Sequence, residues 1–250
     1  MAKWLAAALL LAAAGSRTPA QWYVGGSAAY FDWSESSQSY PVVEHGMLVG
    51  FDAGYTLPAE NGFLFAYRGR LYGGAAQYSG SGFFAPFDLA SGATGYVGTM
   101  QEIQGRYRFG GQLDALFALG GNFWRRQMNA KQAEKYSVAY VAMGAEYNAS
   151  SPGVTAGMRF NLPVWAQLDA GFGAMGFAQD PVLSLGRSLG GSATVGYRFQ
   201  RRWALIAFAD LFRFRQSPER IASIGGADVA GVFQPATSTY TIGLRAEFTR

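Results

Sequence analysis

The run from Tyr240 to Phe248 alternates apolar residues with polar or very small ones. In an extended strand, successive side chains point to opposite faces. The apolar face carries Tyr240, Ile242, Leu244, Ala246 and Phe248. The opposite face carries Arg245 and Glu247. Such a strand is stable where one of its faces meets an apolar phase and the other meets water, so the rest of the chain must provide that boundary.

The same alternation recurs along the chain and constrains the fold class. Apolar residues make up 50% of the sequence and aromatic residues 16%. Nevertheless, no uninterrupted apolar stretch of ~18 residues occurs after Gln21, which excludes a helical membrane protein. Short strands that meet lipid on one face reconcile these facts. We therefore expect an all-β protein, a transmembrane antiparallel up-and-down β-barrel.

Residues 1–20 have the layout of a secretory signal peptide. Lys3 precedes the apolar run Trp4–Ala14, and a small-residue region ends at Ala20. We expect export and a single mature barrel domain over residues 21–250. The chain has no Cys, so disulfides and thiolate metal sites are excluded. A formal charge of +4, which falls to +2 without Lys3 and Arg17, gives no support for nucleic-acid binding.

Period-2 alternation between turn residues predicts ten strands. These are Trp22–Trp33, Gly46–Leu57, Phe63–Tyr72, Tyr96–Phe109, Leu113–Trp124, Val138–Asn148, Val154–Pro163, Leu189–Phe199, Trp203–Arg213 and Ser238–Phe248. Pro163 leaves an alternative, because Asn161–Trp165 could be a turn that leads into an extra strand at Ala166–Phe177. Totals of eight or twelve strands therefore also remain open.

The links between these strands alternate in length. The short links are Pro58–Gly62, Gly110–Gln112, Ala149–Gly153 and Gln200–Arg202. The other links have roughly 12 to 25 residues, as expected for turns at one end of a membrane barrel and loops at the other. Aromatic residues gather near both strand ends and predict two interfacial bands. The band expected at the loop end consists of Phe31, Trp33, Phe123, Trp124 and Phe212.

Charged residues gather on the faces that would line the lumen. The acids are Asp32, Asp52, Glu102, Asp114, Glu146, Asp210 and Glu247. The bases are Arg68, Arg70, Arg106, Arg108, Arg159, Arg198 and Arg245. A barrel of this size has a lumen narrow enough for side chains to fill. We therefore predict an ion-pair network that closes the pore; a solvated interior with loosely paired charges is the alternative.

The predicted loops offer a candidate contact surface. Its aromatic members are Tyr78, Phe83, Phe84 and Phe87, and its first cations are Arg125 and Arg126. Exposed aromatic residues on loops commonly bind partners, although these could instead fold over the lumen as a lid. Cations at the outer rim would lie beside lipopolysaccharide phosphates, or could simply be solvated.

Two patterns could indicate chemistry, but both have simpler explanations. Gly171–Gly176 matches the dinucleotide pattern GxGxxG, yet no helix is expected after it, so we interpret it as a loop or strand rim. The single His in the chain, His45, follows Glu44 at the loop end of the second predicted strand. We expect a solvated loop pair there. No catalytic, cofactor-binding or metal-binding residue is predicted.

The signal peptide, the ten alternating runs and the strand that ends at Phe248 resemble small outer-membrane β-barrel proteins of Gram-negative bacteria, of the OmpA and porin type. The ten-strand count is shared with omptin-type proteases. The resemblance implies an integral outer-membrane location, lipid and lipopolysaccharide as neighbours, and insertion by the barrel-assembly machinery through the C-terminal strand. We expect a structural or surface-interaction protein with an unknown extracellular ligand; a narrow solute channel and a hydrolase or acyltransferase are the alternatives.

Overall fold

A computed structural model describes residues 21–36, 41–58, 60–81, 89–149, 152–173, 176–178, 180–199, 202–224 and 227–250. The predicted signal peptide and Phe83, Phe84 and Phe87 lie outside these residues. No helix among the described residues is long and apolar enough to cross a membrane.

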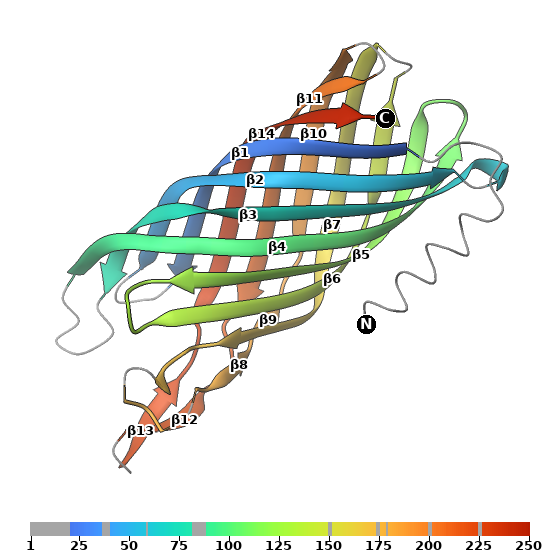
Figure 1. The fold of residues 1–250 in the computed structure, drawn as a ribbon. Coiled ribbons are helices and arrows are strands. Elements are labelled where there is room, and N and C mark those ends of the chain that lie inside the picture. Colours follow the sequence, from blue (N-terminus) through green and yellow to red (C-terminus); the bar gives the residue numbers. More distant parts are fainter. Residues whose placement is uncertain are drawn as a thin grey trace.

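Ten long strands form a closed antiparallel barrel, as predicted (Figure 1). They are β1 (Gln21–Ser36), β2 (Val42–Pro58), β3 (Phe63–Ser81), β4 (Leu89–Phe109), β5 (Leu113–Gln127), β6 (Ala133–Asn148), β7 (Gly153–Asp169), β10 (Gly190–Phe199), β11 (Trp203–Arg215) and β14 (Ala236–Thr249). Neighbours along the chain pair with one another, β7 pairs with β10, and β14 closes the barrel against β1. The fold is therefore fixed by a continuous ladder of backbone hydrogen bonds without a free edge.

The short links gather at one end, which we call the turn end, near the C-terminus in Figure 1. One of them contains the 3-10 turn η1 (Glu60–Gly62), in which Asn61 has a φ of 60°. The opposite end, the loop end, carries β8 (Val182–Ser184), β9 (Gly186–Arg187) and the hairpin of β12 (Arg220–Ile224) and β13 (Ala227–Val232). These four short strands are seen at the lower left of Figure 1.

Most of the predicted long loops are shorter than expected. β1 and β2 are separated by five residues, β3 and β4 by seven, and β5 and β6 by five. The strands continue beyond the predicted ends, because β3 reaches Ser81 and β4 already begins at Leu89. Only the links 170–189 and 216–235 are long.

Pro163 lies within a strand, so the alternative with a turn and an extra strand is wrong. β7 runs through Pro163 to Asp169, and the register against β6 shifts between Ala139 and Tyr140. The shift leaves Val164 as an extra residue, which is how a strand accommodates a proline that cannot donate a hydrogen bond. The bulge also moves the lumen-facing side chains of β7 from odd to even positions.

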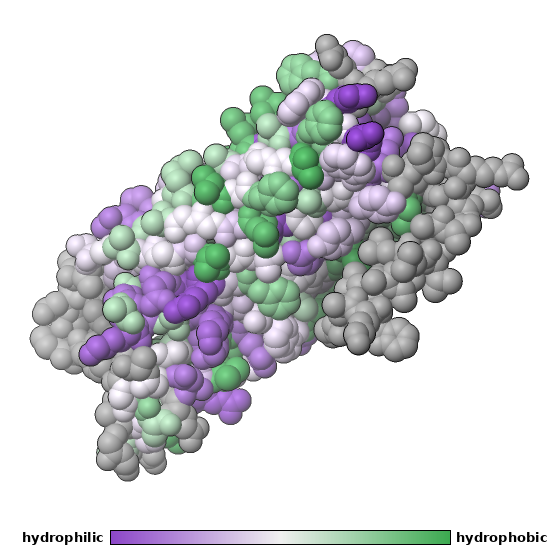
Figure 2. Space-filling view, in the orientation of Figure 1, coloured by the Kyte–Doolittle hydropathy of each residue, from purple (hydrophilic) through white to green (hydrophobic). Residues whose placement is uncertain are grey.

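The outer surface is apolar in the middle and polar towards the loop end (Figure 2). In the middle, Phe51, Leu71 and Leu244 are 55%, 57% and 56% exposed, as expected for side chains that meet lipid. We call this region the apolar belt. Above it, towards the loop end, the outward residues are polar, for example Asp32 and Arg125.

The interior changes in the opposite sense. Inside the apolar belt the lumen is charged, whereas above it buried aromatic residues such as Trp33 (0% exposed) and Tyr136 (1% exposed) fill the barrel. The loop-end aromatic band was therefore predicted wrongly for all members but Phe123, because the other four lie inside as core. Links and short strands add Phe172, Leu183 and Phe214 to this core.

Candidate functional site

The lumen within the apolar belt is crossed by ion pairs between distant strands. The Nε atom of Arg70 on β3 lies 2.8 Å from Asp52 Oδ1 on β2, and its Nη1 lies 3.5 Å from Asp210 on β11. Arg159 on β7 lies 2.6 Å from Glu102 on β4. Asp52 lies opposite Arg70 on the adjacent strand, whereas the Arg70–Asp210 and Arg159–Glu102 contacts join strands that are not neighbours in the sheet. Arg can satisfy two carboxylates at once because its guanidinium presents five donors.

Further contacts extend the network towards the turn end. Its remaining ion pairs are Arg106–Glu146 (2.6 Å), Arg68–Glu146 (3.6 Å), Arg245–Glu247 (2.7 Å), Arg245–Asp52 (3.6 Å) and Arg108–Asp114 (2.8 Å). Neutral groups also take part: the Tyr140 hydroxyl donates to Glu102 at 3.0 Å, and the Ser27 hydroxyl donates to Asp52 at 2.7 Å. The carboxylates are thus bound from more than one side.

Two predicted lumen residues behave differently from the rest. Arg198 lies on the lumen face of β10, but its buried Nε atom has no hydrogen-bond partner among the described residues. Asp32 was expected in the lumen and lies instead on the outer face of β1. The phase was wrong there because Phe31 and Trp33 are buried inside the barrel, which is the reverse of the arrangement in the apolar belt.

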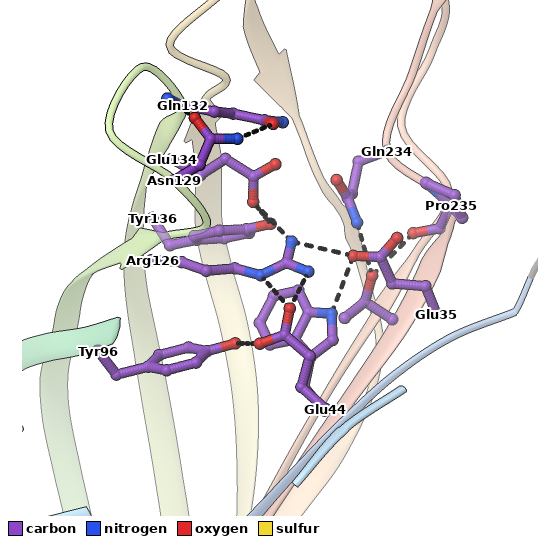
Figure 3. Close-up of polar contacts among 12 residues, drawn as sticks. Glu35, Glu44, Tyr96, Arg126, Asn129, Gln132, Glu134, Tyr136, Gln234 and Pro235 are labelled. Carbon is purple, nitrogen blue, oxygen red and sulfur yellow. Dashed lines mark hydrogen bonds and ion pairs between the residues drawn. The ribbon is translucent and has the colours of Figure 1, made fainter. Parts of the chain in front are cut away.

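A second cluster lies above the apolar belt, and Arg126 is at its centre (Figure 3). The guanidinium contacts Glu44 at 2.5 Å, Glu134 at 2.8 Å and Glu35 at 3.2 Å. We call these four residues the Arg126 cluster. They come from β1, β2, β5 and β6, so the cluster connects the two sides of the barrel near the loop end.

Aromatic side chains hold the three carboxylates in place. Tyr96 donates to Glu44 at 2.5 Å, Tyr136 donates to Glu134 at 2.8 Å, and the Trp33 indole donates to Glu35 at 2.9 Å. The Trp33 ring also lies 4.9 Å from the Arg126 guanidinium carbon, a cation–π contact. Figure 3 shows these side chains converging on one guanidinium.

Three carboxylates surround one cation, so the Arg126 cluster has an excess of negative charge when all groups are ionised. All four of its members are buried. Burial raises the pKa of Glu134 above its ordinary value, although the Arg126 guanidinium lowers it. The cluster is therefore tightly bonded and still carries an excess of negative charge when all its groups are ionised.

The structure corrects three predictions for this end of the barrel. Arg126, expected at the surface, is 2% exposed, whereas its neighbour Arg125 is exposed on the outer face. Glu44, expected in a solvated loop, is 0% exposed, and His45 points outward. Tyr78 belongs to β3 and lies half-buried on the lumen face, not in a protruding loop.

Sequence reasoning missed the Arg126 cluster, although one signal was available. Asp114 and Arg126 are both at even positions of β5, so the phase that sends Asp114 into the lumen also sends Arg126 there. The prediction ended this strand at Trp124 and lost the phase two residues too early.

Two cavities occupy the lumen between the Arg126 cluster and the turn end. One has a volume of about 50 Å³ and charged walls, including Arg159 and Glu102. The other has a volume of about 70 Å³ and largely aromatic walls. They share Arg70, Phe208 and Asp210 as wall residues, so they meet at the level of these side chains.

Other candidate chemistry finds little support in the described part of the chain. No group of three or more His, Asp or Glu residues there could hold a metal ion. Gly171 and Gly176 have φ values of 62° and 95°, which explains the glycines by backbone conformation in the link after β7. The His45 side chain forms no hydrogen bond or ion pair with any other described residue.

Comparison with known proteins identifies the fold. No family model matches the chain, and no curated protein matches its sequence. The outer membrane protease OmpT from Escherichia coli has a similar structure, with a TM-score of 0.54 at 8% identity over 92% of this chain and 96% of OmpT. The β domain of the Bordetella autotransporter BrkA has a TM-score of 0.44 at 12% identity, over 91% of this chain and 99% of that domain. An outer membrane channel from Pseudomonas putida F1 has a TM-score of 0.44 at 9% identity, over 93% of this chain and 97% of that one.

Proposed function

With the fold of an outer-membrane β-barrel as the starting point, we propose that this protein is a closed, non-catalytic barrel that acts as a structural or surface-interaction protein, in the manner of an adhesin. The observation that carries the proposal is the blocked lumen. Ion pairs cross it at two levels, at Arg70–Asp210 and Arg159–Glu102 within the apolar belt and at Arg126–Glu44 above the belt. An ion that entered would have to displace several charge-assisted hydrogen bonds.

The loop end is the part of the molecule suited to contacts outside the cell. Its outer face carries Arg125 and Lys135 directly opposite each other in the β5–β6 register, and Arg213 is exposed on β11. Cations in these positions suit the phosphates of lipopolysaccharide. Ile221 on the β12–β13 hairpin is 74% exposed and supports a contact role for that hairpin.

The same proposal covers how the protein reaches its place. We propose export through the signal peptide at residues 1–20 and insertion by the barrel-assembly machinery; the apolar, outward face of β14, where Leu244 is 56% exposed, supports the insertion step. An enzymatic role has less support, because no hydrogen bond or ion pair joins the His45 side chain to a carboxylate or hydroxyl among the described residues, although Asp32 lies opposite it on β1.

A narrow channel for small solutes is the second candidate. The two lumen cavities favour it, since they interrupt the packing between the blocked levels.

Conductance in a planar lipid bilayer separates the two candidates. We expect the purified barrel to give no steady openings, and Arg126→Ala combined with Arg159→Ala to give small ones, because both levels then lose their central cation. Arg125→Ala, on the outer face, is the matched control and should stay silent. Steady openings of the unaltered protein at the nanosiemens level would replace the closed barrel with the channel.

The lipopolysaccharide contact has its own test. Vesicles of phosphatidylcholine with and without lipopolysaccharide are compared, and lipopolysaccharide should raise the resistance of the inserted barrel to urea. Lys135→Ala and Arg213→Ala together should remove most of that gain, whereas Gln77→Ala, also outward above the belt, should retain it. A gain that persists in the double variant would rule out this contact.

A further inference from the structure

Six aromatic side chains line the larger lumen cavity, which we call the aromatic chamber. Its walls include Phe31, Tyr72, Tyr96, Trp124, Phe208 and Phe212. The polar ends of the two tyrosines are bonded elsewhere, because Tyr72 donates to Asn122 at 2.9 Å and Tyr96 donates to Glu44 at 2.5 Å. Phe208 already carries the Arg70 guanidinium on one face and Trp124 stacks on Tyr136, so the ring surface that remains for a ligand is apolar with π electrons that attract cations.

A carboxylate with spare acceptor capacity lies where this chamber meets the second cavity. Asp210 has Arg70 as its ion-pair partner among the described residues, at 3.5 Å. The same Arg70 lies closer to Asp52, at 2.8 Å, and Asp52 also accepts from Ser27 and has Arg245 at 3.6 Å. By distance, Asp210 is therefore paired less closely than Asp52 and retains acceptor capacity towards the cavities.

The Arg70 guanidinium does not compete strongly as a binding group for anions. It is paired with Asp52, and its guanidinium carbon lies 4.3 Å from the centre of the Phe208 ring. An anion would have to replace Asp52, whereas a cation needs only to add to Asp210. Arginines and acids are balanced in the walls of the two cavities, so the preference for a cation rests on the weaker pairing of Asp210.

The charges along the lumen agree with this preference. The Arg126 cluster on the loop side has three carboxylates for one guanidinium, a formal charge of −2. Below the chamber, the Nε atom of Arg198 is buried without a partner among the described residues, and Arg68 and Arg106 share Glu146. A cation would be attracted from the loop end and stopped by arginines below the chamber.

From these observations we propose that the aromatic chamber binds a small organic cation, with the rings around its apolar groups and the Asp210 carboxylate as its counter-ion. The two cavities measure about 70 and 50 Å³. This volume is several times the roughly 10–15 Å³ that a single water needs, so the cavities hold a ligand of a few non-hydrogen atoms. Methylated ammonium ions have this size and chemistry.

Titration with three probes of similar branched shape tests the proposal. Tetramethylammonium is the cation, tert-butanol the neutral probe and pivalate the anion. Tryptophan emission, which Trp124 in the wall should make sensitive, is followed in the purified full-length barrel in detergent, and calorimetry gives the stoichiometry. We expect saturable binding of one tetramethylammonium, at least fivefold tighter than that of either other probe. A smaller ratio, or no saturable binding, overturns the proposal.

Substitutions locate the site. Asp210→Asn should weaken tetramethylammonium binding at least tenfold, whereas Asp114→Asn, which alters a lumen carboxylate remote from both cavities, should leave it unchanged. Phe212→Leu is the second variant if the first does not fold, as judged by circular dichroism, and should weaken binding about fivefold by removing one ring. Unaltered binding in the folded variant refutes the assignment, whatever the conductance measurements show.

Discussion

The two halves of this barrel are built on opposite patterns. In the half within the apolar belt, the outer face is apolar and the lumen is charged; in the half above it, the outer face is polar and the lumen is filled with aromatic core. On β1 alone, Trp22 faces outward and is 38% exposed, whereas Trp33 faces inward and is 0% exposed. The first half is stabilised by lipid outside and ion pairs inside, and the second resembles a water-soluble barrel.

Arg126→Ala tests this comparison with the largest expected effect. The substitution leaves Glu35, Glu44 and Glu134 buried without their cation, which costs about 3–5 kcal/mol of unfolding free energy. Urea unfolding in detergent, followed by tryptophan emission, measures it. Arg125→Ala, one residue away on the outer face, should change it by less than about 0.5 kcal/mol. Equal losses of unfolding free energy in the Arg126→Ala and Arg125→Ala variants would show that the Arg126 cluster does not stabilise the half of the barrel above the apolar belt.

Trp33→Ala and Trp22→Ala compare the two halves directly. Removing the buried Trp33 opens a cavity in a dry core and should cost about 3–4 kcal/mol. Trp22 meets lipid, which fills the space of a lost ring, so its loss should cost about 1 kcal/mol. The same urea titration applies, and a larger loss for Trp22 would reverse the assignment of core and belt.

Charges introduced on the outer face locate the boundary between the halves. Leu244→Arg places a cation inside the apolar belt and should cost about 2–4 kcal/mol. Gln77→Arg, on the polar outer face above the belt, should be close to neutral, within about 0.5 kcal/mol. The unfolding free energy of both variants is measured in lipid vesicles. A loss for Gln77→Arg as large as that for Leu244→Arg would show that the apolar belt extends to the loop end.

The smallest expected effect is the change of unfolding free energy with pH that Glu134 causes. Because burial raises the pKa of Glu134 in the folded barrel, the folded state takes up a proton before the unfolded state does. The stabilisation from this proton is complete below the pKa of the unfolded state and is lost as the pH rises through the folded pKa.

Glu134→Gln removes that titration while its amide oxygen still accepts from Arg126. From pH 8 to pH 4, the unaltered barrel should therefore gain up to about 1 kcal/mol relative to the variant. The exposed Glu219→Gln serves as the control. A relative loss of stability on acidification would show that Glu134 is ionised throughout.

The two halves also differ in how well the sequence predicts them. Within the apolar belt, lipid forces outward residues to be apolar, so period-2 alternation gives both strand and phase, and Arg70, Glu102 and Arg159 could be assigned to the lumen. Above the belt this constraint ends. Phe31 and Trp33 then look like an interfacial band, although they are core.

The partners of Arg126 could not be found from local pattern. Glu44 is 82 residues away in the sequence, and it meets Arg126 only because several strands lie between them in a known register. The inward and outward alternation along a strand predicts that a side chain points into the lumen, but not which residues it contacts there. That requires the curvature and size of the closed barrel.

The seam between the first and last strands has a consequence for how long the fold persists. Tyr23 pairs with Thr249, so closure joins the two ends of the barrel-forming chain and costs loop-closure entropy. Opening it again would expose two rows of unpaired backbone groups to hydrocarbon, which cannot hydrogen-bond them. The lifetime of the barrel in a membrane is therefore set by the height of that barrier more than by its equilibrium stability.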